Sequence, residues 1–237
     1  MNRACILTTL ALTLTGGFAA AEPPQPQAHA APAVLEGAPK GTVAFDDDGG
    51  RAQIIPRKAV PGRDATYHGG PVVAHGTVQA VFLGSGWRGK ANRGMESKVM
   101  ESLRAAGSAE HTAALQRFGV AAWEAPGLAI EDPAGDPLQG NRISDLEIQS
   151  RLDNLLSGAP IDVNAVYVVF LAPGLESSLG ARSSVRDFAA YHNHFHVAAG
   201  TVHYVVVPFD GEPSRWLANA HQSLGQALIN PEGNGWY

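Results

Sequence analysis

The sequence predicts a single layered domain of the α/β (or α+β) class, in which helices flank a mixed β-sheet. Three observations support this prediction. Strand-like and helix-like segments alternate along the chain, one strand-like segment is apolar almost throughout, and a capping motif precedes an amphipathic helix-like segment. Strands and helices that alternate around a buried strand are typical of folds in which helices cover a sheet.

A secretory signal peptide is expected over residues 1–21. Arg3 supplies a positive charge, residues 4–20 are uncharged and rich in apolar side chains, and Ala19-Ala20-Ala21 forms a cleavage site before Glu22. No later apolar run is long enough to span a bilayer. We therefore expect an exported protein, periplasmic or secreted, without a transmembrane segment.

Composition limits both the domain organisation and the partners. Residues 22–65 are rich in Ala, Pro and Gly and follow neither a strand nor a helix period, so we expect a flexible linker before a globular domain at residues 66–237. The formal net charge of −5 is not that of a nucleic-acid-binding surface, and no nucleic-acid partner is expected.

The first elements of the expected domain each have a local signal. A β-rich run at residues 78–83 ends at Gly84 and predicts a strand. Apolar side chains at helical spacing predict a helix at residues 92–106 that ends at Gly107, and a second short helix follows at residues 109–118.

The second half of the domain continues the alternation. Ser144 and Glu147 form a capping box, and the helix that they begin is expected to end at Gly158. Residues 163–171 are almost continuously apolar, so we expect a central strand that is buried on both faces. The remaining expected elements are a strand at residues 201–208 and a terminal helix at residues 216–229.

The histidines are the most informative residues for function. His192, His194 and His196 alternate with other side chains, so on a strand their three imidazoles share one face. Histidine is the commonest metal ligand, and such a face can bind zinc or copper. The alternative is a polar sheet face on which the imidazoles are solvated or hydrogen-bonded.

The expected terminal helix carries His221 on the same face as Leu224 and Leu228. A zincin helix reads H-E-x-x-H, in which both histidines bind zinc and the glutamate activates water. In this helix the glutamate position is Gln222 and the second histidine position is Gly225. A zincin-like helix is therefore expected, but one that lacks the base and one ligand of a hydrolase.

Strand geometry limits the metal site that these histidines can form. Successive same-face residues of a strand lie ~6.6 Å apart, whereas two ligand atoms of one zinc ion lie only ~3.4 Å apart. We therefore expect at most two strand histidines at one ion, and the predicted zinc site consists of His192, His194 and His221 with water as the fourth ligand. In the alternative, the strand imidazoles face solvent and His221 packs against the sheet.

Several blocks of the chain resemble the EXORDIUM (phosphate-induced protein) family. The blocks are Tyr67-His68-Gly69-Gly70-Pro71-Val72-Val73, residues 164–174, Ala190-Tyr191-His192, residues 203–208 and Asn230-Pro231-Glu232-Gly233-Asn234-Gly235-Trp236-Tyr237. Plant members are secreted, associated with the cell wall and without established catalysis. Bacterial relatives are exported and often carry a His-Glu-x-x-Glu peptidase-like helix, whose acids are amides or absent in this chain.

Two hypotheses follow from these observations. The first is an exported, non-catalytic domain (a pseudo-peptidase) that binds an unidentified ligand or a component of the cell envelope. The second is a zinc-dependent hydrolase or peptidase that uses His221, the strand histidines and a base such as Glu212 or Glu232. Gln222 and Gly225 favour the first hypothesis, because neither residue can supply the missing chemistry.

Overall fold

The computed structural model describes residues 42–45, 51–57, 66–125, 129–131, 141–157, 162 and 164–236. These residues belong to one unit, Pro32–Tyr237. The expected signal peptide lies outside the described residues. Within the described part of the chain, no helix has both the length and the apolar character that crossing a membrane requires.

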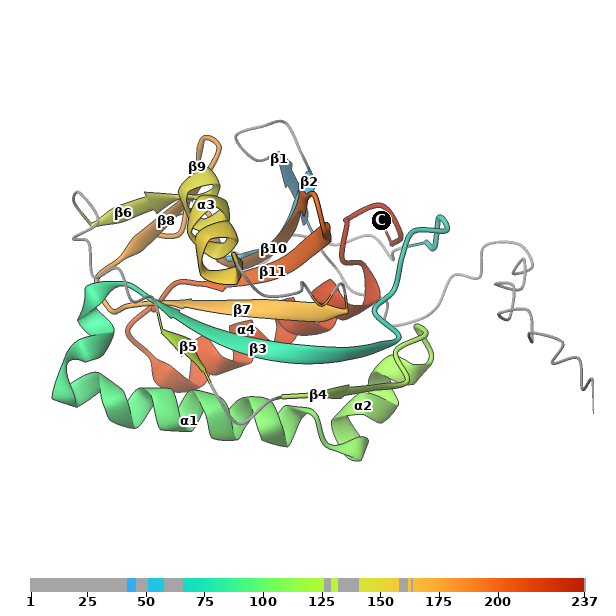
Figure 1. Ribbon diagram of the computed structural model, residues 1–237, viewed down its shortest axis with the longest axis horizontal. Coiled ribbons are helices and arrows are strands. Elements are labelled where there is room, and N and C mark those ends of the chain that lie inside the picture. The colour runs from blue at the N-terminus through green and yellow to red at the C-terminus, as the bar shows by residue number, and fades with distance from the viewer. Residues whose placement is uncertain are drawn as a thin grey trace, which may run out of the picture. The chain divides into compact units, whose positions relative to one another are not determined.

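The main sheet has eight strands and is mixed (Figure 1). Its strands are β1 (Thr42–Phe45), β2 (Arg51–Pro56), β3 (His75–Leu83), β4 (Ala122–Glu124), β5 (Ile130–Glu131), β7 (Ala165–Leu171), β10 (Phe188–Val197) and β11 (Gly200–Val207). Their order is β1-β2-β10-β11-β7-β3-β4, with β5 also paired to β3. The strands β11, β7, β3 and β4 are parallel neighbours, whereas β10 runs antiparallel to both β11 and β2.

Helices cover both faces of this sheet, as the sequence predicts. The helices are α1 (Lys90–Ala106), α2 (Ala109–Gln116), α3 (Asp145–Leu156) and α4 (Pro213–Ile229), with a short 3₁₀ turn η1 at Ser85–Arg88. The helices α1 and α4 pack on one face, and α3 packs on the other beside a three-stranded sheet (Figure 1). That smaller sheet contains β6 (Arg142–Ser144), β8 (Glu176–Leu179) and β9 (Arg182–Ser183).

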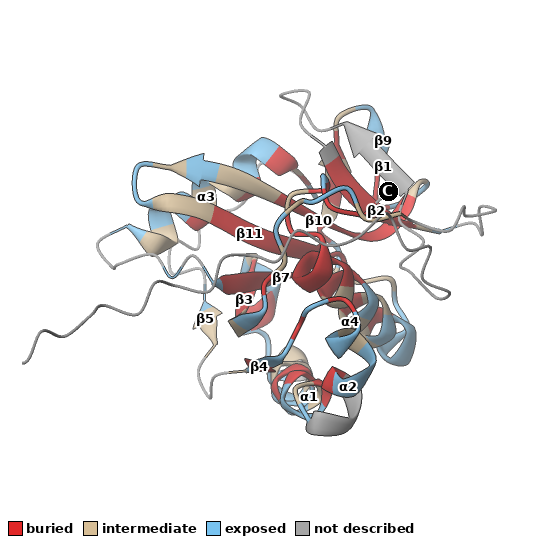
Figure 2. Cartoon of the chain, turned by 90° about the vertical axis from the view of Figure 1, so that its right-hand side faces the viewer, coloured by how far each residue is buried: buried red, intermediate tan, exposed pale blue. Residues whose placement is uncertain are grey.

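Strand β7 is the centre of the core, and all of its residues are buried (Figure 2). Val166, Val168 and Phe170 pack into the cluster formed with α1 and α4. Tyr167 and Val169 pack into the cluster formed with α3. The expectation of a central strand buried on both faces is confirmed, since an apolar side chain at every position suits a strand covered on both sides.

The expected helix boundaries agree with the structure to within a few residues. The Ser144 hydroxyl accepts a hydrogen bond from the Glu147 N–H at 3.2 Å, so Ser144 is the N-cap of α3. Gly107 follows the last residue of α1, and its N–H donates to the Leu103 carbonyl. Local capping chemistry therefore determines where these helices begin and end.

The predicted linker is wrong over residues 51–56, which form β2. This strand pairs with β10 over registers that include Ile54 with Tyr191 and Gln53 with His192. Ala52 and Ile54 are fully buried, and Gln53 is 3% exposed. The neighbouring β1 pairs with β2 and also lies inside the predicted linker. Strand β2 has only six residues, which are too few to show a clear sequence period. Its pairing with β10 could not be predicted either, because β10 lies far along the chain.

Candidate functional site

The candidate site is a cluster of four histidines, His192, His194, His196 and His203, which we call the histidine cluster. The first three lie on β10, and His203 on β11 is paired directly with His194. Val205, the partner of His192, packs on the α1 and α4 side of the sheet. The cluster therefore lies on that face of the sheet.

The cluster runs from the core towards solvent. His192 is 1% exposed and His203 is 7% exposed, whereas His194 is half-buried and His196 is exposed. Ring centroids are 5.4 Å apart for His194 and His196, and 6.4 Å apart for His194 and His203. The imidazole Nδ1 of His196 lies 3.0 Å from the Thr201 hydroxyl. The imidazoles are thus close neighbours that a ligand can approach from the exposed end.

His192 is held in one tautomer by the C-terminal cap of α4. Its Nε2 lies 2.9 Å from the Asn230 carbonyl, which accepts only from an N–H. Nδ1 therefore carries the lone pair, and this buried atom has no hydrogen-bond partner among the described residues. Burial lowers the pKa of His192 to about 4; the Asn230 carbonyl opposes this shift, and nearby His194 and His203 add to it. His192 is consequently neutral at pH 7.

His203 has no hydrogen bond at either ring nitrogen within the described structure, although both atoms are buried. Its Nε2 lies 4.0 Å from Oε1 of Glu232, which is too far for a hydrogen bond. Burial and then His194 lower the pKa of His203 to about 4, while Glu232 opposes the shift. Buried polar atoms without partners are uncommon in native proteins and often mark a site for water or a ligand.

The segment after α4 forms one wall of the site. The Asn230 side chain accepts from the Gly235 N–H at 2.7 Å and donates to the Trp236 carbonyl at 2.8 Å. Gln53 of β2 donates to the same carbonyl at 3.2 Å. These bonds close the segment into a fixed turn, which brings Glu232 to the histidine cluster. The sequence indicates Glu232 only as a possible base and does not predict that it lies beside the histidines.

The structure does not bring His221 to the strand histidines. The His221 Nε2 lies 3.0 Å from the Ser102 hydroxyl on α1. His221 is also nine positions before Asn230 along α4, a rise of roughly 13.5 Å, whereas His192 contacts Asn230 itself. The predicted combination of His192, His194 and His221 is therefore not assembled. Among the described residues, no three His, Cys, Asp or Glu side chains are placed to hold a metal ion.

Helix α4 also lacks an acidic residue at the expected catalytic position. Gln222 is exposed, and the position of Gly225 offers no side chain. Glu212, the other considered base, is the N-cap of α4 and accepts from the Ser214 N–H at 3.1 Å. Glu212 and the histidine cluster therefore lie at opposite ends of a 17-residue helix.

A second polar cluster lies on the opposite face of β10 and β11, and its centre is the fully buried Asp145. Oδ1 of Asp145 accepts from the hydroxyls of Tyr191 and Tyr204, both at 2.7 Å. Oδ2 accepts from the side-chain amides of Gln149 at 2.9 Å and Asn193 at 3.0 Å. We call these five residues the Asp145 network. Burial raises the pKa of Asp145, and the hydrogen bond from Tyr191 is the largest of four that oppose the shift.

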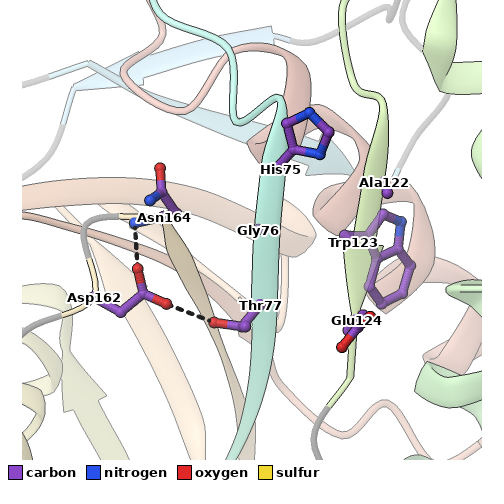
Figure 3. Close-up of a pocket in the computed structure, with 8 residues that line it drawn as sticks. All are labelled: His75, Gly76, Thr77, Ala122, Trp123, Glu124, Asp162 and Asn164. Carbon is purple, nitrogen blue, oxygen red and sulfur yellow. Dashed lines mark hydrogen bonds between the residues drawn. The ribbon is translucent and has the colours of Figure 1, made fainter. Parts of the chain in front are cut away.

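A pocket of about 310 Å³ lies at the amino ends of β3 and β4 (Figure 3). His75, Thr77, Glu124 and Asp162 contribute polar side chains to its lining. The Asp162 carboxylate already accepts from the Thr77 hydroxyl at 3.0 Å and from the Asn164 N–H at 2.9 Å. This acid stabilises the start of β7, and the pocket has fewer unsatisfied polar atoms than the histidine cluster.

Comparison with known proteins gives no relative: no family model, no curated protein and no solved structure matches the chain.

Proposed function

We propose that the chain is an exported, non-catalytic domain of the EXORDIUM-like type, a pseudo-peptidase that binds a ligand or a component of the cell envelope. The expected signal peptide and the motif blocks of the sequence support export and the family resemblance. The histidine cluster is the proposed binding site.

One observation carries the non-catalytic part of this proposal. His221 is the only side chain of the zincin-like motif on α4 that can bind a metal, and its Nε2 lies against Ser102 of α1. The exposed Gln222 cannot accept a proton from water at neutral pH, and Gly225 cannot bind a metal. An H-E-x-x-H hydrolase needs all three of these functions together.

The binding part rests on buried polar atoms without partners. Among the described residues, such atoms include Nδ1 of His192 and both ring nitrogens of His203 on the sheet. Helix α4 adds the Ser223 hydroxyl and Oε1 of Gln226. Several unsatisfied buried groups in one domain cost ~1–3 kcal/mol each unless water or a ligand completes them.

A zinc-dependent hydrolase remains the second candidate, because one acid does lie beside neutral imidazoles. Glu232 Oε1 is 4.0 Å from His203 Nε2. In such an enzyme the carboxylate of Glu232 would take the proton of an attacking water. This candidate needs no residue of the degenerate motif on α4.

Proteolysis assays separate the two candidates. Purified protein is incubated with casein-type substrates, once with added zinc and once with a chelator. We expect the rate of substrate cleavage in both samples to equal that of buffer without the protein. Gln222→Glu should not restore activity, because Gly225 still offers no ligand. Chelator-sensitive proteolysis that Glu232→Gln reduces by about 10²–10⁴-fold would instead establish the hydrolase.

A further inference from the structure

We propose that His194 and His203 form a two-histidine clamp for a divalent late transition-metal ion, such as Cu²⁺, Ni²⁺ or Zn²⁺. The protein supplies two imidazole ligands, and water fills the remaining coordination positions. This inference names the ligand class of the proposed binding site and therefore rests on the proposed function.

The first support is the register of β10 and β11. His194 and His203 are directly paired across these antiparallel strands, so their Cβ atoms lie ~4.5–5.5 Å apart on one face. Their ring centroids are 6.4 Å apart. Two imidazoles on one tetrahedral zinc ion have centroids roughly 5 Å apart. The centroids must therefore approach each other by about 1.4 Å, and rotation of the half-buried His194 side chain is the simplest movement that brings them together.

The second support is the state of His203. The ring is 7% exposed, and neither nitrogen has a hydrogen bond among the described residues. A neutral imidazole has one donor and one acceptor nitrogen, and only the acceptor binds a metal. A metal ion would use a lone pair that nothing in the described structure uses.

The third support is Glu232, which is suited to position His203. Metal-binding histidines usually donate their other N–H to a carboxylate or a carbonyl. The Glu232 carboxylate lies 4.0 Å from His203 Nε2, so a small movement makes that hydrogen bond and leaves Nδ1 for the metal. Its negative charge also offsets part of the charge of a bound cation.

The rest of the histidine cluster explains why the clamp has two ligands. His192 is 1% exposed and lies at the core end of the cluster, so an ion that enters from the exposed end reaches His194 and His203 first. The Nδ1 of exposed His196 is already beside Thr201. The described residues contain no group of three His, Cys, Asp or Glu side chains placed to hold a metal. A two-ligand site exchanges its ion readily, and its affinities should follow the order Cu²⁺ above Ni²⁺ and Zn²⁺.

Calorimetric titration of untagged protein with copper, nickel or zinc salts tests the clamp. We expect one ion per chain, with binding weakened at least 100-fold in both His194→Ala and His203→Gln. His75→Ala is the matched control, because this exposed histidine lies on β3 outside the cluster, and it should bind as the wild type does. Glu232→Gln should weaken binding by about 10–100-fold at unchanged stoichiometry.

Electron paramagnetic resonance of the copper complex provides a second readout if His203→Gln fails to fold. We expect coupling to two imidazole nitrogens in the wild type and to one in His194→Ala. The clamp is overturned if no stoichiometric metal binding is seen, or if His75→Ala weakens binding as much as His194→Ala does. In either case water, not a metal ion, completes the hydrogen bonds of the buried nitrogens. That result leaves the proposed non-catalytic function standing if proteolysis is also absent, whereas chelator-sensitive proteolysis overturns the proposed function whatever the titration gives.

Discussion

The hairpin of β10 and β11 carries two polar clusters back to back, and they differ in how well their polar atoms are satisfied. On the α3 face, the Asp145 carboxylate accepts four side-chain hydrogen bonds. On the α4 face, His203 has none among the described residues. A fully satisfied buried network stabilises one structure, whereas an incomplete network has capacity for a ligand. We therefore expect a structural role for the Asp145 network, and the difference supports the binding role that we propose for the histidine cluster.

Removal of Asp145 should have the largest effect on stability. Asp145→Ala removes the carboxylate that accepts from the hydroxyls of Tyr191 and Tyr204 and from two side-chain amides, and we expect a loss of about 3–5 kcal/mol in the free energy of unfolding. Chemical denaturation followed by circular dichroism measures this loss. Asp153→Ala on the exposed side of α3 is the control, with an expected change within about 0.5 kcal/mol. Equal losses in the two variants would show that the network is not structural.

Acid should destabilise the protein through the histidine cluster. The pKa of buried His192 is about 4 in the folded state against about 6.5 in the unfolded state. The unfolded chain therefore binds more protons between these values, and stability falls as the pH drops from 6.5 towards 4. The full difference is on the order of 3 kcal/mol for His192, and His203, whose pKa is also lowered to about 4, adds a loss in the same direction.

Denaturation midpoints between pH 7 and pH 4 measure this acid sensitivity. His192→Gln should flatten the profile, because glutamine can donate to Asn230 but does not titrate. The raised pKa of Asp145 acts in the opposite direction. The folded state binds a proton at this acid more readily than the unfolded state does, so this group favours the folded state as the pH falls. A profile that keeps its full slope in His192→Gln would assign the acid sensitivity to other groups.

The N-cap of α3 should have the smallest effect of the three. Ser144→Ala removes the hydrogen bond from the Glu147 N–H, which costs about 1 kcal/mol. Ser144 directly precedes Asp145, so the two variants separate the capping of the helix from the buried network. If Ser144→Ala costs as much as Asp145→Ala, Asp145 acts mainly by placing the end of the helix. Thermal melting of both variants in the same buffer decides this.

Features of the fold that depend on neighbouring residues could be predicted from the sequence. Features that depend on contacts between distant parts of the chain could not. The apolar run at β7 and the capping of α3 by Ser144 are readable, because neighbouring residues determine them. Asp145 was missed because an aspartate in the first turn of a helix is ordinarily exposed and stabilised by the helix dipole. Only the docking of α3 against Tyr191 and Tyr204 buries it.

The candidate site was predictable only in part, for the same reason. Alternation along β10 indicates that His192 and His194 share a face, but His203 joins them through the pairing of β10 with β11. His221 was wrongly grouped with them, because a helical period gives the face of a residue and not its position along the sheet. In the structure His221 contacts α1 instead.

The placement of Gln53 has a consequence for how the protein is made. Gln53 and its partner Trp236 are separated by 183 residues. At about 5–20 residues per second, roughly 10–40 s pass during translation between synthesis of the two residues. Until β10 has been made, β2 can pair only with β1, and its other edge has no partner strand. The nascent chain thus carries a strand with unsatisfied backbone groups and apolar side chains, which is the kind of segment that chaperones protect from aggregation.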